Sequence, residues 1–142
     1  MTFEKLHSDT SCDCVEDLNE DTEAIFSRRI SGKQLKEKDF RSYWERGKRP
    51  ESEKCSGICD FKGVSINILS SFNENEVFEI YKESRKINPN ISKYITKFKL
   101  KSNAGIPKPD PIENNPFHYN FFKCDEFSIE KIDNLNILEI DV

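Results

Sequence analysis

The stretch KGVSINIL, residues 62–69, carries the clearest structural signal in the chain. Val64, Ile66 and Ile68 alternate with Ser65 and Asn67, and this period of two is typical of a strand with one apolar face. Comparable patterns occur on both sides of it. The sequence therefore predicts about five strands, at residues 23–30, 64–69, 92–100, 117–122 and 135–142.

Two principal helices are predicted between these strands. Ser31 and Gln34 have the spacing of a capping box, in which each side chain satisfies a free backbone amide at a helix start, so residues 33–46 are expected to be helical. A second helix is expected over about residues 73–86, beginning at a capping asparagine. Residues 104–116 contain four prolines and are predicted to form a long loop, since proline suits neither a central strand nor a helix interior.

The order of these elements predicts the α+β class. We expect a single small domain over residues 24–142, with a mostly antiparallel sheet of about five strands and two principal helices. Residues 1–23 show no sustained period and are predicted to form an acidic, irregular N-terminal arm. Residues 1–24 contain eight acidic side chains and one lysine. Such an arm is either a solvated tail or a segment that covers a basic surface or contacts a basic partner.

Length and composition indicate a compartment. The chain has 142 residues, of which 35% are hydrophobic and 34% charged. No stretch approaches the roughly 18 consecutive apolar residues of a membrane span. The N-terminus also lacks the apolar segment of a secretory signal. We therefore expect a soluble cytoplasmic protein without a membrane partner, in which thiols stay reduced.

Four of the five cysteines form two close pairs, Cys12 with Cys14 and Cys55 with Cys59. Structural zinc sites commonly take four such ligands as two pairs, and a metal there would fix the arm to the body. The odd number of cysteines and the reducing compartment argue against disulfides. The expectation is either one structural zinc held by these four cysteines, or no cofactor and reduced thiols.

A catalytic site can also be assembled from the sequence. His118 lies on the polar face of a predicted strand, where it could transfer a proton. One arginine, one serine and one late carboxylate occur in order along the chain, as Arg28 or Arg29, then Ser65, then Glu126, Glu130 or Glu139. This order is similar to the Arg–Ser–Glu arrangement of the ADP-ribosyltransferases. That resemblance implies that the arginine and serine hold a dinucleotide and that the glutamate polarises its ribose. If the chain is an enzyme, we expect its site at Arg29, Ser65 and His118.

Binding functions are the other classes that the sequence supports. Residues 38–49 combine basic and aromatic side chains, as nucleic-acid-binding segments do, although a pI near 5.3 argues against that partner. The charged arm, the proline-rich loop and an apolar sheet suit a small interaction module whose partner is another protein. Bacterial immunity and phage-defence accessory proteins have this profile. Protein binding is therefore the expected function, with the small enzyme and nucleic-acid binding as alternatives.

Overall fold

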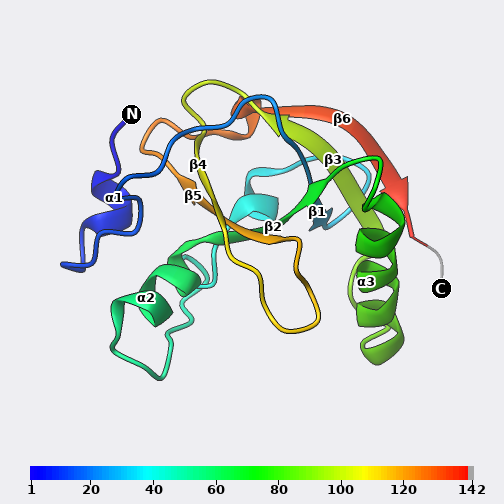
Figure 1. Cartoon of the computed structure of the whole chain (residues 1–142), viewed down its shortest axis with the longest axis horizontal. Helices are drawn as coiled ribbons and strands as arrows, with labels where there is room; N and C mark the ends of the chain where they lie inside the picture. The colour runs from blue at the N-terminus through cyan, green and yellow to red at the C-terminus, as the bar shows by residue number, and fades with distance from the viewer. Residues whose placement is uncertain (141–142) are drawn as a thin grey trace.

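One antiparallel sheet organises the chain (Figure 1). The computed structural model describes residues 1–140, and within them the strand order is β4-β5-β2-β1-β3-β6. The strands are β1 (Ile25–Ile30), β2 (Val64–Leu69), β3 (Tyr94–Leu100), β4 (Gly105–Pro109), β5 (His118–Lys123) and β6 (Ile132–Glu139). The α+β class is confirmed, with six strands where about five were predicted. Val142, which belongs to the last predicted strand, lies outside the described residues.

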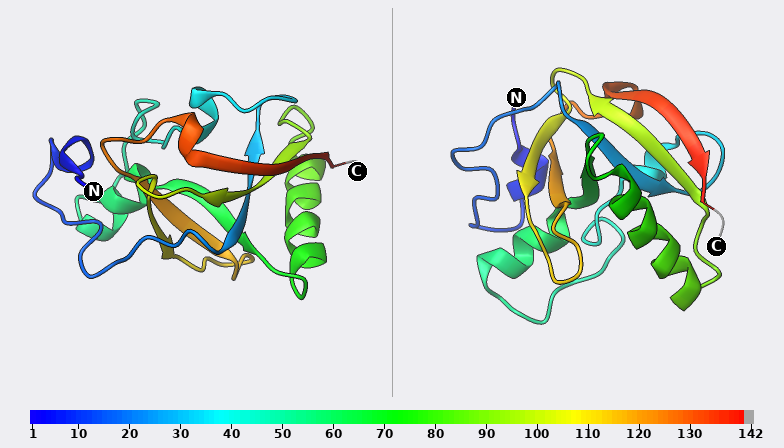
Figure 2. Two further views of the ribbon diagram at one scale, coloured as in Figure 1. Left: turned by 90° about the horizontal axis from the view of Figure 1, so that it is seen from above. Right: turned by 45° about the vertical axis from the view of Figure 1, so that its right-hand side comes forward.

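Three α-helices and two 3-10 turns accompany the sheet. They are α1 (Glu4–His7), α2 (Cys55–Lys62), α3 (Glu74–Ile87), η1 (Glu37–Phe40) and η2 (Ile129–Lys131). The helix predicted for residues 73–86 is confirmed as α3, which buries Val77 and Tyr81. The views in Figures 1 and 2 place α2 and α3 toward opposite ends of the sheet, with the loop between β4 and β5 lying between them. No helix in the described part of the chain is long and apolar enough to cross a membrane.

The helix predicted over residues 33–46 is wrong, because only the short turn η1 forms there. The carboxylate of Asp39 accepts the backbone amides of Ser31 and Lys36, each at 2.9 Å. A side chain inside the predicted helix therefore takes the Ser31 amide that the capping box was expected to satisfy, and also a second amide within the predicted helix. Phe40 next to it is fully buried in the core. Local side-chain bonding and burial thus hold this segment in turns.

Two segments for which no strand or helix was predicted contain regular structure. The segment of the second cysteine pair is helix α2, and Cys55 and Cys59 lie four residues apart on one face of it. The proline-rich segment 104–116 begins with strand β4. Because β4 lies at the edge of the sheet, the missing amides of Pro107 and Pro109 are tolerated there.

Apolar side chains pack on both faces of the sheet. One face carries the main core, in which the rings of Phe40 and Phe98 meet edge to face with centroids 5.4 Å apart. On the other face α3 covers a second cluster, formed by Leu69, Val77, Tyr81, Ile95 and Ile140. The polar face of β2 that the sequence indicated is therefore only partly open to solvent, because α3 covers one end of it.

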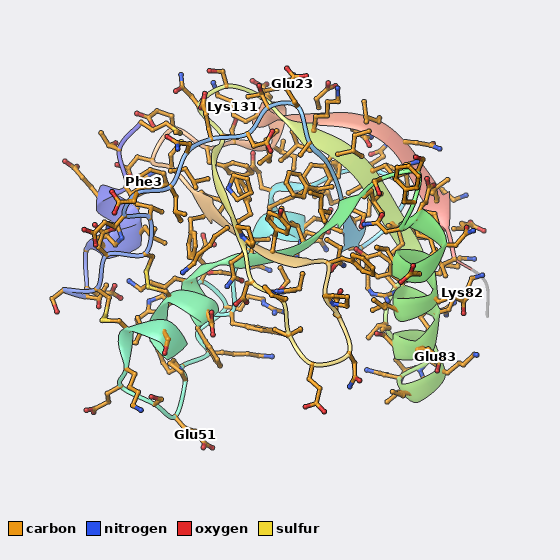
Figure 3. All side chains as sticks on the ribbon, in the orientation of Figure 1. Phe3, Glu23, Glu51, Lys82, Glu83 and Lys131 are labelled. Carbon is orange, nitrogen blue, oxygen red and sulfur yellow. A yellow bond between two sulfur atoms is a disulfide. The ribbon has the colours of Figure 1, made fainter. Side chains whose placement is uncertain are left out.

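Two disulfides join the N-terminal arm to α2 (Figure 3). They link Cys12 to Cys55 and Cys14 to Cys59, with Cα atoms 5.4 and 5.5 Å apart. The expectation that these thiols stay reduced is wrong for this structure, because all four are bonded in disulfides. The odd cysteine is Cys124, which is buried and unpaired. A disulfide sulfur is not the thiolate that binds zinc. Zinc binding by the four cysteines stays a prediction for the reduced chain.

The arm is largely irregular apart from α1, and it packs closely on the body. Phe3, labelled in Figure 3, packs against the cluster that contains both disulfides. Asp9 accepts a hydrogen bond from Nε1 of Trp44 at 2.9 Å and pairs with Lys62, whose side chain is only 3% exposed. The acidic arm therefore neutralises a buried basic side chain, as expected of an arm that covers a basic surface.

Candidate active site at Ser65, His118 and Asp110

Ser65, His118 and Asp110 are hydrogen-bonded in series on one face of the sheet. Ser65 of β2 pairs with Asn120 of β5, so His118, two residues earlier, projects from the same face. The Ser65 hydroxyl lies 3.1 Å from Nε2 of His118. Nδ1 of His118 lies 2.9 Å from the backbone oxygen of Asp110 and 3.3 Å from its carboxylate oxygen Oδ2. The structure thus brings Ser65 and His118 together as the enzyme hypothesis requires.

These partners fix the form of the His118 ring. Both oxygens of Asp110 that face Nδ1 are acceptors, so a neutral His118 carries its proton on Nδ1. Nε2 then has a free lone pair that accepts the hydrogen bond from the Ser65 hydroxyl. A serine whose hydroxyl points at such a lone pair, on an imidazole oriented by an aspartate, is the arrangement of a nucleophile with its general base.

The solvent exposure of Ser65, His118 and Asp110 suits catalysis. Ser65 is exposed to solvent. The side chain of His118 is 11% exposed and that of Asp110 is 30% exposed. A substrate can therefore reach the hydroxyl, while the ring that would take its proton is largely shielded from water.

The hairpin of β4 and β5 places Asp110 beside His118. Asp110 directly follows β4, and its amide donates to the backbone oxygen of His118 at 2.9 Å. Further out, a bridge between Ile112 and Asn115 closes the loop, and the Asn115 side chain donates to Oδ1 of the buried Asn67 at 2.8 Å. Asp110 and His118 therefore meet at the base of a loop that is also anchored at its far end.

Asn120 fixes the position of the Asp110 carboxylate. Its amide nitrogen donates to Oδ2 of Asp110 and to Oδ1 of Asp60, both at 3.1 Å. Asn120 is 3% exposed, and a Cβ on Gly63 would come within 2.8 Å of its side chain, so glycine is needed at position 63. Burial raises the pKa of Asp60, and the nearby charge of Asp110 raises it further. Asp110 is thus oriented by a side chain that the sheet itself holds in place.

The two arginines of β1 reach different places. Arg29 lies on the same face as Ser65, as predicted, but its guanidinium turns to α3 and donates to the backbone oxygens of Tyr81 and Ser92. The prediction that Arg29 acts together with Ser65 and a histidine is therefore not supported by its contacts. Arg28 reaches the serine instead, since its Nη1 donates to the backbone oxygen of Ser65 at 2.6 Å.

The late carboxylate of the site differs from those that the resemblance implied. Glu139 lies at the end of β6, three strands away from β2, and pairs with Lys93 at 3.7 Å. Within residues 1–140, no hydrogen bond joins Glu126 or Glu130 to the serine or the histidine of the site. The ADP-ribosyltransferase arrangement therefore lacks its glutamate here.

Sequence reasoning missed Asp110, which supplies the carboxylate. Residues 104–116 were predicted to be a loop, so the pairing of β4 with β5 was not visible. The detectable signal was an apolar residue directly before the prolines in the segment GIPKP, which suits an edge strand before the predicted strand at His118.

A larger cavity of about 300 Å³ lies between the arm and the body. Two of its three lysines are in ion pairs, Lys62 with Asp9 and Lys123 with Glu45, the latter at 2.7 Å, and Nζ of Lys5 donates to a backbone oxygen at 3.3 Å. It also contains Cys124, whose thiol donates to a backbone oxygen at 3.0 Å. Burial raises the pKa of this thiol, which keeps it protonated and unreactive. Of Cys124 and Ser65, only Ser65 has its reactive atom beside a histidine nitrogen, and it lies outside this cavity.

Neither metal geometry nor similarity to a known protein assigns a function. Within residues 1–140, no group of three or more His, Cys, Asp or Glu side chains is arranged to hold a metal ion. Comparisons with family models, with curated proteins and with solved structures found no match. Function therefore has to be inferred from the geometry around Ser65.

Proposed function

We propose that the protein is a serine hydrolase that cleaves an ester or a related acyl bond, with Ser65 as nucleophile and His118 as general base. One observation carries this proposal: the Ser65 hydroxyl lies 3.1 Å from Nε2 of a histidine whose other ring nitrogen faces Asp110. Catalytic triads are defined by geometry and by the role of each group, and their order along the chain differs between folds. The order Ser65, Asp110, His118 on an antiparallel sheet is therefore compatible with this chemistry.

The proposed reaction has two steps. Ser65 Oγ attacks the carbonyl carbon of the substrate, and its proton passes to Nε2 of His118. Asp110 stabilises the imidazolium that forms. His118 then gives the proton to the leaving alcohol as the bond between carbon and alcohol oxygen breaks, which leaves the acyl group on Ser65. In the second step His118 takes a proton from water as the water oxygen attacks the acyl carbon. The bond between that carbon and Ser65 Oγ then breaks, His118 returns the proton to Oγ, and the carboxylic acid leaves.

A fluorophosphonate probe is expected to label Ser65. Such probes react with serines that a general base has activated, forming a phosphorus–oxygen bond with loss of fluoride. Mass spectrometry should find the label on the peptide that contains Ser65, and the protein should hydrolyse p-nitrophenyl acetate. Ser65→Ala should abolish both reactions. His118→Ala should slow both by roughly 10²- to 10⁴-fold, the usual contribution of a general base.

Ser71→Ala is the matched control, because Ser71 is also an exposed serine close to β2. This variant should react as the wild type does. Thermal unfolding of each variant, with His118→Gln as a conservative alternative, separates loss of fold from loss of chemistry. Equal labelling in the wild type and in a folded His118 variant would contradict the proposal, as would the absence of any label on the folded wild type.

A second proposed function is the binding of another protein, which the sequence favoured. Phe72 and Ile87 lie at the two ends of α3 and are 94% and 86% exposed. Covering such side chains with a partner removes apolar surface from water and is favourable. We expect a tagged wild-type chain to co-purify with a partner and a Phe72→Ser, Ile87→Ser variant to lose it. Leu135→Ser, at a residue 46% exposed on β6, is the control. Retention of the same protein by the double variant would contradict a contact through α3.

A further inference from the structure

A small cavity beside Ser65 is lined mainly by arginine. It measures about 50 Å³, and its lining includes Arg28, Arg41, Ser42, Arg46, Gly63 and Ser65. A single buried water needs only roughly 10–15 Å³, so the cavity can admit a larger polar group. Ser65 belongs both to this cavity and to the candidate active site.

The three guanidinium groups have no acidic partner in the described part of the chain. No carboxylate oxygen of residues 1–140 comes within 4.0 Å of them. Two acids of the same segment are engaged elsewhere, since Asp39 accepts two backbone amides and Glu45 pairs with a lysine. In the larger cavity, by contrast, Lys62 and Lys123 are in ion pairs. The three guanidinium groups of the arginine cavity form no ion pair within residues 1–140.

Hydrogen bonds hold Arg28 at a buried position, where its positive charge is unfavourable. Its Nε donates to the backbone oxygen of Asp39 at 2.5 Å, and its Nη1 donates to that of Ser65 at 2.6 Å. Burial lowers the pKa of Arg28 to about 10, and the charge of Arg46 also lowers it, while the nearby charge of Asp39 raises it. A buried cation whose hydrogen bonds go to backbone oxygens, close to another cation, is stabilised further by a bound anion.

The segment that carries Arg41 and Arg46 is also held in place. The Arg46 guanidinium lies 4.7 Å from the centroid of the Tyr43 ring, and that ring packs on Phe61 of α2 at 5.5 Å. The amide of Trp44 donates to the backbone oxygen of Phe61 at 2.9 Å. The backbone that presents these arginines is therefore ordered before any ligand arrives, which lowers the entropic cost of binding.

We propose that this cavity binds a phosphate group on the substrate of Ser65, so that the substrates are phosphate-bearing esters. This inference rests on the proposed hydrolase function. Guanidinium groups present N–H donors in a fork that matches two oxygens of a phosphate, and three such groups suit a dianion better than a single carboxylate. Ser65 lines the same cavity and its backbone oxygen accepts from Arg28, so a phosphate bound there would lie next to the residue that carries the proposed nucleophile.

Titration of the ¹⁵N-labelled protein with inorganic phosphate, followed by NMR, tests the site. We expect saturable shifts of the amides of residues 41–46 and of Ser65. The R41Q/R46Q variant should bind phosphate about tenfold or more weakly for each guanidinium removed. Arg49→Gln is the matched control, because Arg49 comes from the same stretch but stacks on Trp44 at 3.7 Å and does not line the cavity. It should leave phosphate affinity unchanged.

The outcomes separate this site from the hydrolase proposal. Equal phosphate affinity in the wild type and in R41Q/R46Q would overturn the phosphate site, as would shifts that do not saturate or equal affinity for acetate. Ser65→Ala should keep phosphate affinity within twofold. Phosphate binding without fluorophosphonate labelling would retain the anion site and reject the hydrolase. Labelling without phosphate binding would reject the anion site alone.

Discussion

Gly105→Ala is expected to remove a large part of the free energy of unfolding. Gly105 opens strand β4 with φ of +149°, a conformation that side-chain-bearing residues rarely adopt. A Cβ there would overlap the backbone oxygen of Phe122 and lie 2.8 Å from Cε1 of Phe121. Both neighbours are at most 1% exposed and belong to the central part of the sheet, so neither can move aside.

The size of this effect follows from two costs that act together. A strained backbone conformation costs roughly 1–3 kcal/mol. Overpacking a core costs roughly another 1–3 kcal/mol. The total stability of a domain is only about 5–15 kcal/mol, so the two costs remove a large part of it. Urea unfolding followed by circular dichroism measures the loss.

Gly32→Ala is the control for this prediction. A Cβ at Gly32 meets nothing within 4 Å, so the free energy of unfolding should change by less than about 0.5 kcal/mol. If Gly105→Ala unfolded at the same urea concentration as the wild type, the close approach of β4 to β5 described here would be wrong.

Loss of the disulfides is expected to have the next largest effect. The bonds Cys12–Cys55 and Cys14–Cys59 join residues 43 and 45 positions apart. In the loop-entropy account, a cross-link that closes a loop of this length stabilises the fold by roughly 4 kcal/mol. The two loops overlap, so the second bond adds less than the first. Removing both should also free the arm, and with it the contact of Asp9 with Lys62.

Urea unfolding with and without dithiothreitol measures this effect. The Cys12→Ser, Cys55→Ser variant should lose only roughly 2 kcal/mol, because Cys14–Cys59 still closes almost the same loop, and reduction of that remaining bond should lower the stability by roughly 4 kcal/mol more. Cys124→Ser is the control, since Cys124 is in neither bond and a serine hydroxyl can replace its hydrogen bond to a backbone oxygen. An unfolding midpoint unchanged by full reduction would show that the bonds are not structural. Elemental analysis of the reduced protein with added zinc tests the remaining metal prediction.

The strands and α3 were predictable because their signals are local. Alternation in residues 64–69 and 94–100 comes from the backbone repeat of two residues, and it holds whichever strand becomes the neighbour. The same reasoning identified Ser65 and His118 as polar residues on strands. It failed for residues 33–46, where the carboxylate of Asp39 competes with a helix for backbone amides.

The candidate site could be predicted only in part, because the sequence of a strand does not specify which strand it pairs with or in which register. His118 lies near Ser65 because β5 pairs with β2, and Asp110 lies near His118 because β4 pairs with β5. The sequence favoured Arg29 as the arginine of the site. Arg28 and Arg29 point to opposite faces of their strand, and only the packing decided which of them contacts Ser65.

The sequence by itself therefore determined the fold class, most of the strands, the helix α3 and two of the three residues of the proposed site. Each of these depends on the periodicity of a short segment. The tertiary structure alone decided the pairing of the cysteines, the edge position of β4 and the contact of Ser65, His118 and Asp110. The two disulfides and the contact of Ser65 with His118 join residues 43, 45 and 53 positions apart, whereas Asp110 and His118 are 8 apart and meet through the pairing of β4 with β5. Contacts of that kind are set by how strands pair and pack, and no local pattern specifies them.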